Sequence, residues 1–186
     1  MHAQTVNDDG ESAQRRTFAA MKTIQLLRAL TEAEVDFVLV GGLAVQLHGF
    51  QRATFDIDLV LAMNDVNLSR FIEIARRHDL RPIIPVPIDA LKDAAQVDRW
   101  HREKGMLAFS LREPRAAGCV VDVLVRPDVA WERLAGNAVL GSLFGRPVRI
   151  AAIDDLLAMK RVANRPKDQL DIEALEKIKR GEDPNA

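Results

Sequence analysis

The stretch VLVGGLAVQLHGFQRATFDIDLVL, residues 38–61, decides the fold because two apolar runs in it carry residues that such runs rarely hold. The first run ends at the pair Gly41-Gly42, and the second contains Asp56 and Asp58 among Phe, Ile, Leu and Val. Apolar runs of this length are typical of buried strands. A buried carboxylate is costly unless a cation or a metal ion accompanies it, so the sequence raises the question of what these two acids bind.

The bulk composition is that of an ordinary folded domain. The chain has 186 residues, of which 48% are hydrophobic and 28% charged, enough to bury a core without disulfides. The formal net charge of −1 gives no overall electrostatic reason to bind nucleic acid or a membrane. No apolar run approaches the ~20 residues of a membrane span, and the polar N-terminus does not resemble a signal peptide. We therefore expect a cytoplasmic protein that makes no membrane contact.

The pattern of apolar residues predicts alternating helices and strands. Strands are expected over residues 35–40, 55–62, 105–111, 118–125 and 145–151, with a short edge strand or loop at 81–89. Helices are expected over 13–30, 43–49, 65–80, 89–100, 127–135, 153–163 and 167–180. This predicts an α/β (α+β) fold, with a mixed central sheet of about five strands covered by helices. We expect a disordered N-terminus over 1–12, a core over 13–152, and a helical segment over 153–186 packed on that core.

Three acids in apolar strands predict a metal site. Side chains two positions apart on a strand share a face, so Asp56 and Asp58 should project together. Asp122 interrupts another apolar strand, and a divalent cation among the three acids would relieve their repulsion. Oxygen ligands suit Mg²⁺ or Mn²⁺. The alternative is that Asp56 and Asp58 lie at a strand end facing water, or pair with the nearby Arg52.

The residues around these acids suggest a binding site for a nucleoside triphosphate. Gly41-Gly42 lies between a strand and a helix, where backbone amides can approach a phosphate closely; a plain tight turn is the alternative. Arg52 and Thr54 precede the acids, and a guanidinium there could bind phosphate or hold Asp56; the alternative is a solvated surface arginine.

The C-terminal segment adds a candidate cation and a candidate acid. Lys160 follows an apolar helical stripe and could neutralise charge on a leaving pyrophosphate. Asp168 shares a helix face with Asp171 and could orient a basic neighbour. The alternatives are that Asp168 only complements the helix dipole, and that the tail is only a helical cover.

Taken in order, these motifs resemble the nucleotidyltransferase superfamily, typified by DNA polymerase β and the aminoglycoside nucleotidyltransferases. The resemblance rests on Gly41-Gly42 opening a helix, on the motif Asp56-Ile57-Asp58, and on Asp122 in a later strand. The stretch GGLAVQLHGFQRATFDIDLVL is similar to the form common in small bacterial members. The tail DDLLAMKRVANRPKDQLDIEAL resembles a segment of abortive-infection-type nucleotidyltransferase toxins. The resemblance covers residues 38–175.

The resemblance implies a fold, a chemistry and roles for individual residues. It implies a nucleotidyltransferase fold with C-terminal helices, in which Asp56 and Asp58 bind metal. Asp122 would complete the metal site and activate the attacking hydroxyl, and Gly41-Gly42 would hold the triphosphate. Many members carry serine at the second glycine position, so a hydroxyl contact with phosphate is missing in this chain.

The leading hypothesis is a transferase that uses Mg²⁺ or Mn²⁺. It would bind a nucleoside triphosphate such as ATP and move its nucleoside monophosphate to a hydroxyl of a tRNA, a protein or a small molecule. The resemblance also suggests a role in phage defence, with a cognate toxin or antitoxin as partner. The alternative is a non-catalytic nucleotide-binding or antitoxin-like module that keeps the fold, although retention of all three acids argues against a degenerate binder.

Overall fold

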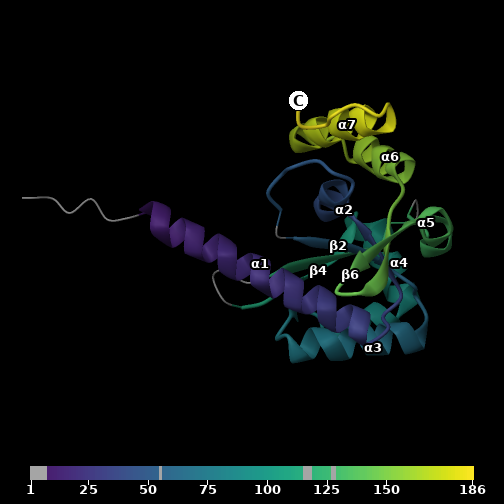
Figure 1. Cartoon of the computed structure of the whole chain (residues 1–186). Helices are drawn as coiled ribbons and strands as arrows, with labels where there is room; N and C mark the ends of the chain where they lie inside the picture. Colours follow the sequence, from purple (N-terminus) through teal and green to yellow (C-terminus); the bar gives the residue numbers. More distant parts are fainter. Residues whose placement is uncertain (1–7, 55, 115–118, 127–128) are drawn as a thin grey trace, which may run out of the picture.

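The computed structural model describes residues 8–54, 56–114, 119–126 and 129–186. Within them, seven strands form one mixed sheet with helices packed against it (Figure 1). The strands are β1 (Phe37–Val40), β2 (Ile57–Leu61), β3 (Arg81–Pro82), β4 (Ala108–Arg112), β5 (Val120–Leu124), β6 (Val139–Leu143) and β7 (Arg146–Ile150). The α-helices are α1 (Asp8–Glu32), α2 (Gly41–Leu47), α3 (Asp65–Arg77), α4 (Ala94–Lys104), α5 (Trp131–Asn137), α6 (Ile153–Ala163) and α7 (Pro166–Lys179), with a 3₁₀ helix at Ile88–Lys92.

The order of strands places the acid-bearing strands side by side at the centre of the sheet. The order is β3-β4-β5-β2-β1-β7-β6, with β2 antiparallel to β1 and parallel to β5. All four residues of β1 are buried, which matches its continuous apolar sequence. In this register Asp58 lies opposite Val40 on one side and Asp122 on the other. The pairing therefore brings two of the three candidate acids next to each other, beside the end of β1.

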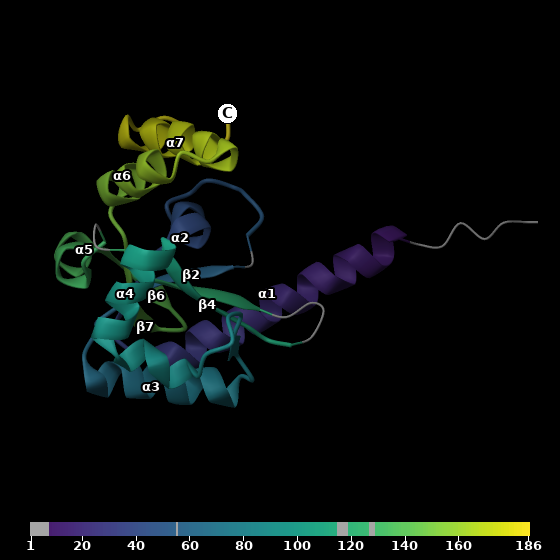
Figure 2. The same cartoon turned by 180° about the vertical axis from the view of Figure 1, so that it is seen from behind.

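Helices cover the sheet in two groups. On α3, Leu68, Phe71, Ile72 and Ala75 are buried as the sequence predicts, and the Asn64 side chain caps the helix by accepting from the Asn67 backbone N–H. The C-terminal helices α6 and α7 pack on each other and contact α2, away from α3 (Figures 1 and 2). Because α2 directly follows β1, this packing sets the C-terminal helices beside the end of the strand that leads to Gly41.

The mixed α/β class is confirmed, while several details differ from the sequence prediction. The helix expected over 89–100 is replaced by the 3₁₀ helix Ile88–Lys92 and by α4, which ends at Lys104. Helix α1 begins at Asp8, so residues 8–12, expected to be disordered, are helical, and residues 1–7 lie outside the described part. The described sheet has seven strands instead of about five, and β6 was not predicted at all. The short edge strand expected at 81–89 is present as β3. Among the described helices, none has the length and apolarity needed to cross a membrane.

Candidate functional site

A cavity of about 260 Å³ lies where β1, β2 and β5 meet the C-terminal helices. Every site residue singled out in the sequence lines it: Gly41, Gly42, Arg52, Thr54, Asp56, Asp58, Asp122, Lys160 and Asp168. The structure thus brings together residues that are spread over more than a hundred positions of the chain. Their chemical roles remain predictions, and the contacts described next show what each residue can do.

Asp58 and Asp122 form the acidic side of the cavity. The pKa of Asp58 is raised to about 6, chiefly by burial and then by the carboxylates of Asp122 and Asp56, while the Gly42 backbone N–H and the charge of Lys160 act against the rise. The Oδ1 atom of Asp122 is buried and has no hydrogen-bond partner among the described residues. A cation bound between Asp122 and Asp58 would give the Asp122 oxygen a partner and would relieve the repulsion between the two carboxylates.

Asp56 is placed differently from the other two acids. It lies one position before β2 begins and is exposed, so the strand-end alternative describes it better than a place within the strand. It still lines the cavity and still raises the pKa of Asp58. Across the described residues, no three His, Cys, Asp or Glu side chains are already grouped to hold a metal ion. The all-oxygen donor set fits Mg²⁺ or Mn²⁺, and the metal site stays a prediction.

The glycine pair is required by the side chains packed against it. Gly41 opens α2 with a φ of +64°, and a Cβ atom there would lie 1.9 Å from Asp58 Oδ2. A Cβ at Gly42 would lie 3.1 Å from both Arg52 Cζ and Thr54 Oγ1. The Gly42 N–H also donates to the Asp58 carboxylate. The two glycines therefore leave space for the side chains of Asp58, Arg52 and Thr54 at the cavity wall. This reason for a glycine pair was not predicted from the sequence.

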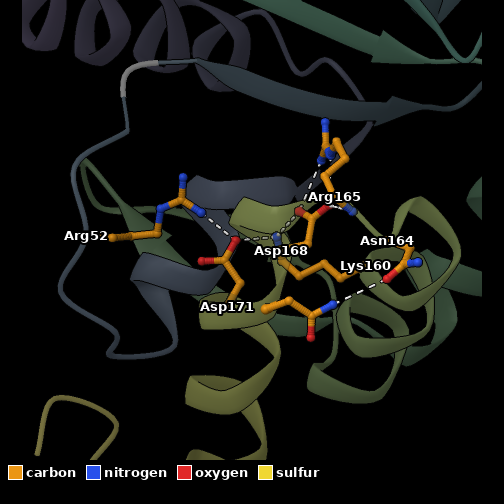
Figure 3. Close-up of polar contacts among 7 residues, drawn as sticks. Arg52, Lys160, Asn164, Arg165, Asp168 and Asp171 are labelled. Carbon is orange, nitrogen blue, oxygen red and sulfur yellow. Dashed lines mark hydrogen bonds and ion pairs between the residues drawn. The ribbon is translucent and has the colours of Figure 1, made fainter.

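A buried cluster of alternating charges forms the basic side (Figure 3). Lys160 Nζ donates to Asp171 Oδ2 and, at 3.5 Å, to Asp168 Oδ1. Arg52 Nη1 donates to the same Oδ2 atom of Asp171. Arg52 therefore pairs with an acid of α7, and the predicted alternative of a pair with Asp56 or Asp58 is not among the contacts seen in the described residues.

Asp168 combines the two roles that the sequence left open. Its carboxylate accepts from the Arg165 backbone N–H at 3.2 Å and from Arg165 Nε at 2.7 Å, which caps the start of α7. It also contacts Lys160. Burial acts to raise the pKa of Asp168, but the hydrogen bonds from Arg165 and the charge of Lys160 hold it below its ordinary value. Asp168 is thus an ionised helix cap that also contacts a cavity lysine.

Two residues that line the cavity, Arg126 and Asp171, were not among the site candidates drawn from the sequence, whereas Arg165 and Lys167 were expected near the triphosphate together with Lys160. Asp171 is the most buried of them and joins two candidate cations. The only signal for it in the sequence was its spacing of three residues from Asp168, which places both on one face of α7. Leu107, Ala108 and Leu124 add an apolar wall from β4, β5 and the residue before β4.

No protein-family model and no curated protein matches the chain. The crystal structure of an antigenic nucleotidyltransferase-like protein from Paracoccidioides brasiliensis matches with a TM-score of 0.47 and 18% sequence identity, over 88% of this chain and 76% of the other. The chain is therefore similar to a nucleotidyltransferase-like protein.

Proposed function

We propose that this chain is a metal-dependent nucleotidyltransferase that moves a nucleoside monophosphate from a nucleoside triphosphate to a hydroxyl group of an acceptor. The observation that carries the proposal is that one cavity holds an acidic pair with no salt-bridge partner among the described residues on one wall, and two cations on the other. One wall has the strained Asp58–Asp122 pair, and the other has Lys160 and Arg52. A triphosphate with a divalent cation needs carboxylates to bind the metal ion and basic side chains to bind the phosphates.

The acids would serve the reacting hydroxyl and the metal. Asp56, Asp58 and Asp122 would hold Mg²⁺ or Mn²⁺, which when bound neutralises charge on the attacking and leaving oxygens. The unpartnered Oδ1 of Asp122 is suited to accept the proton of the acceptor hydroxyl. The Gly42 backbone N–H lies beside the Asp58 carboxylate and favours its ionised form, which is the form that a metal ion binds.

The cations would serve the phosphates. Lys160 is buried among carboxylates at the cavity wall, and Arg52 reaches the same wall from the loop before β2. Both can donate to phosphate oxygens and stabilise charge that develops on the leaving pyrophosphate. Gly41, Gly42 and Thr54 would border the triphosphate, and Asp168 would keep Lys160 and Arg165 in place.

Transfer of label tests this proposal. The purified protein would be incubated with each α-labelled nucleoside triphosphate and Mg²⁺ or Mn²⁺, together with tRNA, lysate protein or aminoglycosides in separate reactions. We expect one acceptor class to take up label, and Asp58→Asn to abolish the uptake. Asp155→Asn is the matched control, because Asp155 is also a buried acid but pairs with Arg133 and Asn137 outside the cavity lining.

The outcomes of this assay separate the two hypotheses. Metal-dependent nucleotide binding without transfer to any acceptor would favour the non-catalytic alternative. Absence of both binding and transfer would contradict a nucleotide function of any kind. Co-purification of a partner that inhibits transfer would support the further proposal of a toxin–antitoxin pair.

A further inference from the structure

We propose that Asp171 is a positioning residue that holds Arg52 and Lys160 ready for the triphosphate, so that α7 acts as part of the site and not only as a cover. The inference rests on the proposed function and adds to it a residue that contacts neither the phosphates nor the reacting atoms. Its action on the substrate would pass through the two cations.

The geometry centres on a single oxygen atom. Asp171 Oδ2 accepts from Arg52 Nη1 and from Lys160 Nζ, and these cations come from two different parts of the chain, the loop before β2 and helix α6 (Figure 3). The side chain of Asp171 is 2% exposed, against 7% for Lys160 and 24% for Arg52. The anchor is therefore the most deeply buried of the three, while both cations also line the cavity.

Such an anchor has a clear physical use. Long, flexible Arg and Lys side chains lose rotamer freedom when they bind a ligand, unless the free protein has already removed that freedom. A carboxylate fixed on a helix removes that freedom before the ligand arrives. Because both cations meet the same oxygen, Asp171 sets their separation as well as their individual positions.

The loop that carries Arg52 is also held through its backbone by the C-terminal segment. Asn185, which follows α7, accepts from the Gln51 N–H at 2.7 Å and donates through Nδ2 to the Gly49 carbonyl at 3.1 Å. The residue directly before Arg52 is thus fixed by the segment after α7, while the Arg52 side chain is fixed by α7 itself. These two contacts are independent and point to the same conclusion.

The positioning role can be tested because it and simple electrostatics predict opposite changes in polyanion affinity when the Asp171 carboxylate is removed. Asp171→Asn removes a negative charge next to two cations, so simple electrostatics predicts tighter binding of a polyanion. Positioning predicts weaker binding, because an amide oxygen holds two cations less firmly than a carboxylate does. The sign of the change therefore separates the two accounts.

The experiment measures binding of inorganic tripolyphosphate with Mg²⁺ by calorimetry. The proteins are the wild type, Asp171→Asn, Arg52→Ala, the double variant and Asp155→Asn. We expect each single change at Asp171 or Arg52 to weaken binding about 10-fold, and the double variant to bind no worse than the weaker single variant. That lack of additivity is the readout that a purely structural role would not produce.

Controls for folding accompany the binding data. Asp155→Asn also breaks an ion pair of a buried carboxylate, here with the half-exposed Arg133, and should lower the melting temperature while leaving tripolyphosphate affinity unchanged. If Asp171→Asn does not fold, Asp171→Glu replaces it, because glutamate keeps the charge but displaces the oxygen by one methylene. Positioning predicts that this variant also binds more weakly than the wild type.

Each outcome has a defined meaning. Equal or tighter binding by Asp171→Asn, or losses that multiply in the double variant, would overturn the positioning role and leave the proposed function standing. No binding by the wild-type protein would overturn the proposed function, and the inference with it.

Discussion

The position of Asp58 suits a metal ligand, but it makes the ionised carboxylate costly when no ligand is bound. Asp58 lies between Gly42 and Asp122, and burial and two neighbouring acids disfavour its ionised form. Functional sites commonly keep such strain, at the expense of stability. The conflict can be measured as a dependence of folding stability on pH.

We expect Asp58→Asn to stabilise the metal-free protein at high pH. The pKa of Asp58 is about 6 in the folded state against an ordinary 3.8, so between these values the folded protein binds more protons than the unfolded chain. Stability therefore falls as pH rises through that window, by at most about 3 kcal/mol. Denaturant unfolding at pH 4 and pH 8 with a chelator should show the variant more stable at pH 8 and similar to wild type at pH 4. A variant less stable than wild type at pH 8 would contradict this.

Gly41→Ala should damage the site as well as the fold. The φ of +64° costs a Cβ-bearing residue about 1–2 kcal/mol, and the added Cβ would push Asp58 away from the cavity wall. Gly105→Ala is the matched control, because its φ is +62° and nothing lies within 4 Å of the added atom. Thermal unfolding should show a larger loss for Gly41→Ala, and only that variant should lose Mg²⁺-dependent nucleotide binding. Equal losses would mean that the contact with Asp58 does not matter.

Lys160→Ala should slow transfer by roughly 10–1,000-fold if the ammonium stabilises charge in the transition state. The same variant should also lose stability. Lys160 is buried between two carboxylates, and breaking a buried ion pair typically costs about 3–5 kcal/mol. Unfolding and transfer assays beside Lys179→Ala, an exposed lysine paired with Asp154, would test both parts. Full activity in Lys160→Ala would remove it from the site.

Among single residues, the site candidates that could be predicted from the sequence are those that interrupt or end a run of apolar residues. Asp58 and Asp122 stood out because each interrupts an apolar strand, and the glycine pair stood out because it ends one. Asp171 did not stand out, because an acid in the early turns of an exposed-looking helix is ordinary. Its partner Arg52 lies 119 positions away, and no local pattern reports a contact across that distance.

Among the elements, helices with strong periodicity were predicted almost to the residue. Helix α6 has the predicted bounds, Ile153–Ala163, and α7 differs from its prediction by a single residue at each end. Strand β6 was missed because its sequence VLGSL is short and contains a glycine, and because the β6–β7 turn places Phe144 at a φ of 55°, a conformation rare for a side-chain-bearing residue. A sequence rule that requires Asn or Asp before the turn glycine does not find this hairpin.

The contact between Asn185 and the loop before β2 gives a prediction at the scale of elements. Asn185→Ala removes the acceptor for the Gln51 N–H and the donor to the Gly49 carbonyl. We expect faster hydrogen exchange at the Gln51 amide and weaker tripolyphosphate binding by a few-fold, with little change in global stability, because local openings need not involve the core. Asn137→Ala, which removes a contact to Asp155 outside the cavity lining, is the control. Unchanged exchange at Gln51 would show that the loop is held by other contacts.

For the molecule as a whole, the C-terminal segment is as much a part of the site as the sheet is. The strands and α2 contribute Asp58, Asp122 and the glycine pair, while α6 and α7 contribute Lys160, Asp168 and Asp171. The two groups of helices and strands meet through contacts of α2 with α6 and α7. The candidate metal ligands therefore come from the sheet, while Lys160 comes from the C-terminal helices and Arg52 is paired with α7.

This arrangement predicts that metal and nucleotide together stabilise the protein more than either does alone. ATP without a divalent cation would bring its phosphates close to Asp58 and Asp122, whose repulsion already raises the pKa of Asp58. A ligand at 100 times its Kd adds about 2.7 kcal/mol of stability, which in a protein of this size raises the melting temperature by roughly 5–10 °C. Thermal unfolding would compare ATP with Mg²⁺, ATP with chelator, and Mg²⁺ alone.

We expect a shift of that size only for ATP with Mg²⁺, and its loss in Asp58→Asn. The other nucleoside triphosphates would be tested in the same way, because the cavity cations contact phosphates and do not by themselves select a base. An equal shift for ATP with chelator and with Mg²⁺ would show that the acids do not hold a metal ion for the nucleotide. In that case the opposing walls of the cavity would be a structural ion network, and the site would have to be sought elsewhere on the molecule.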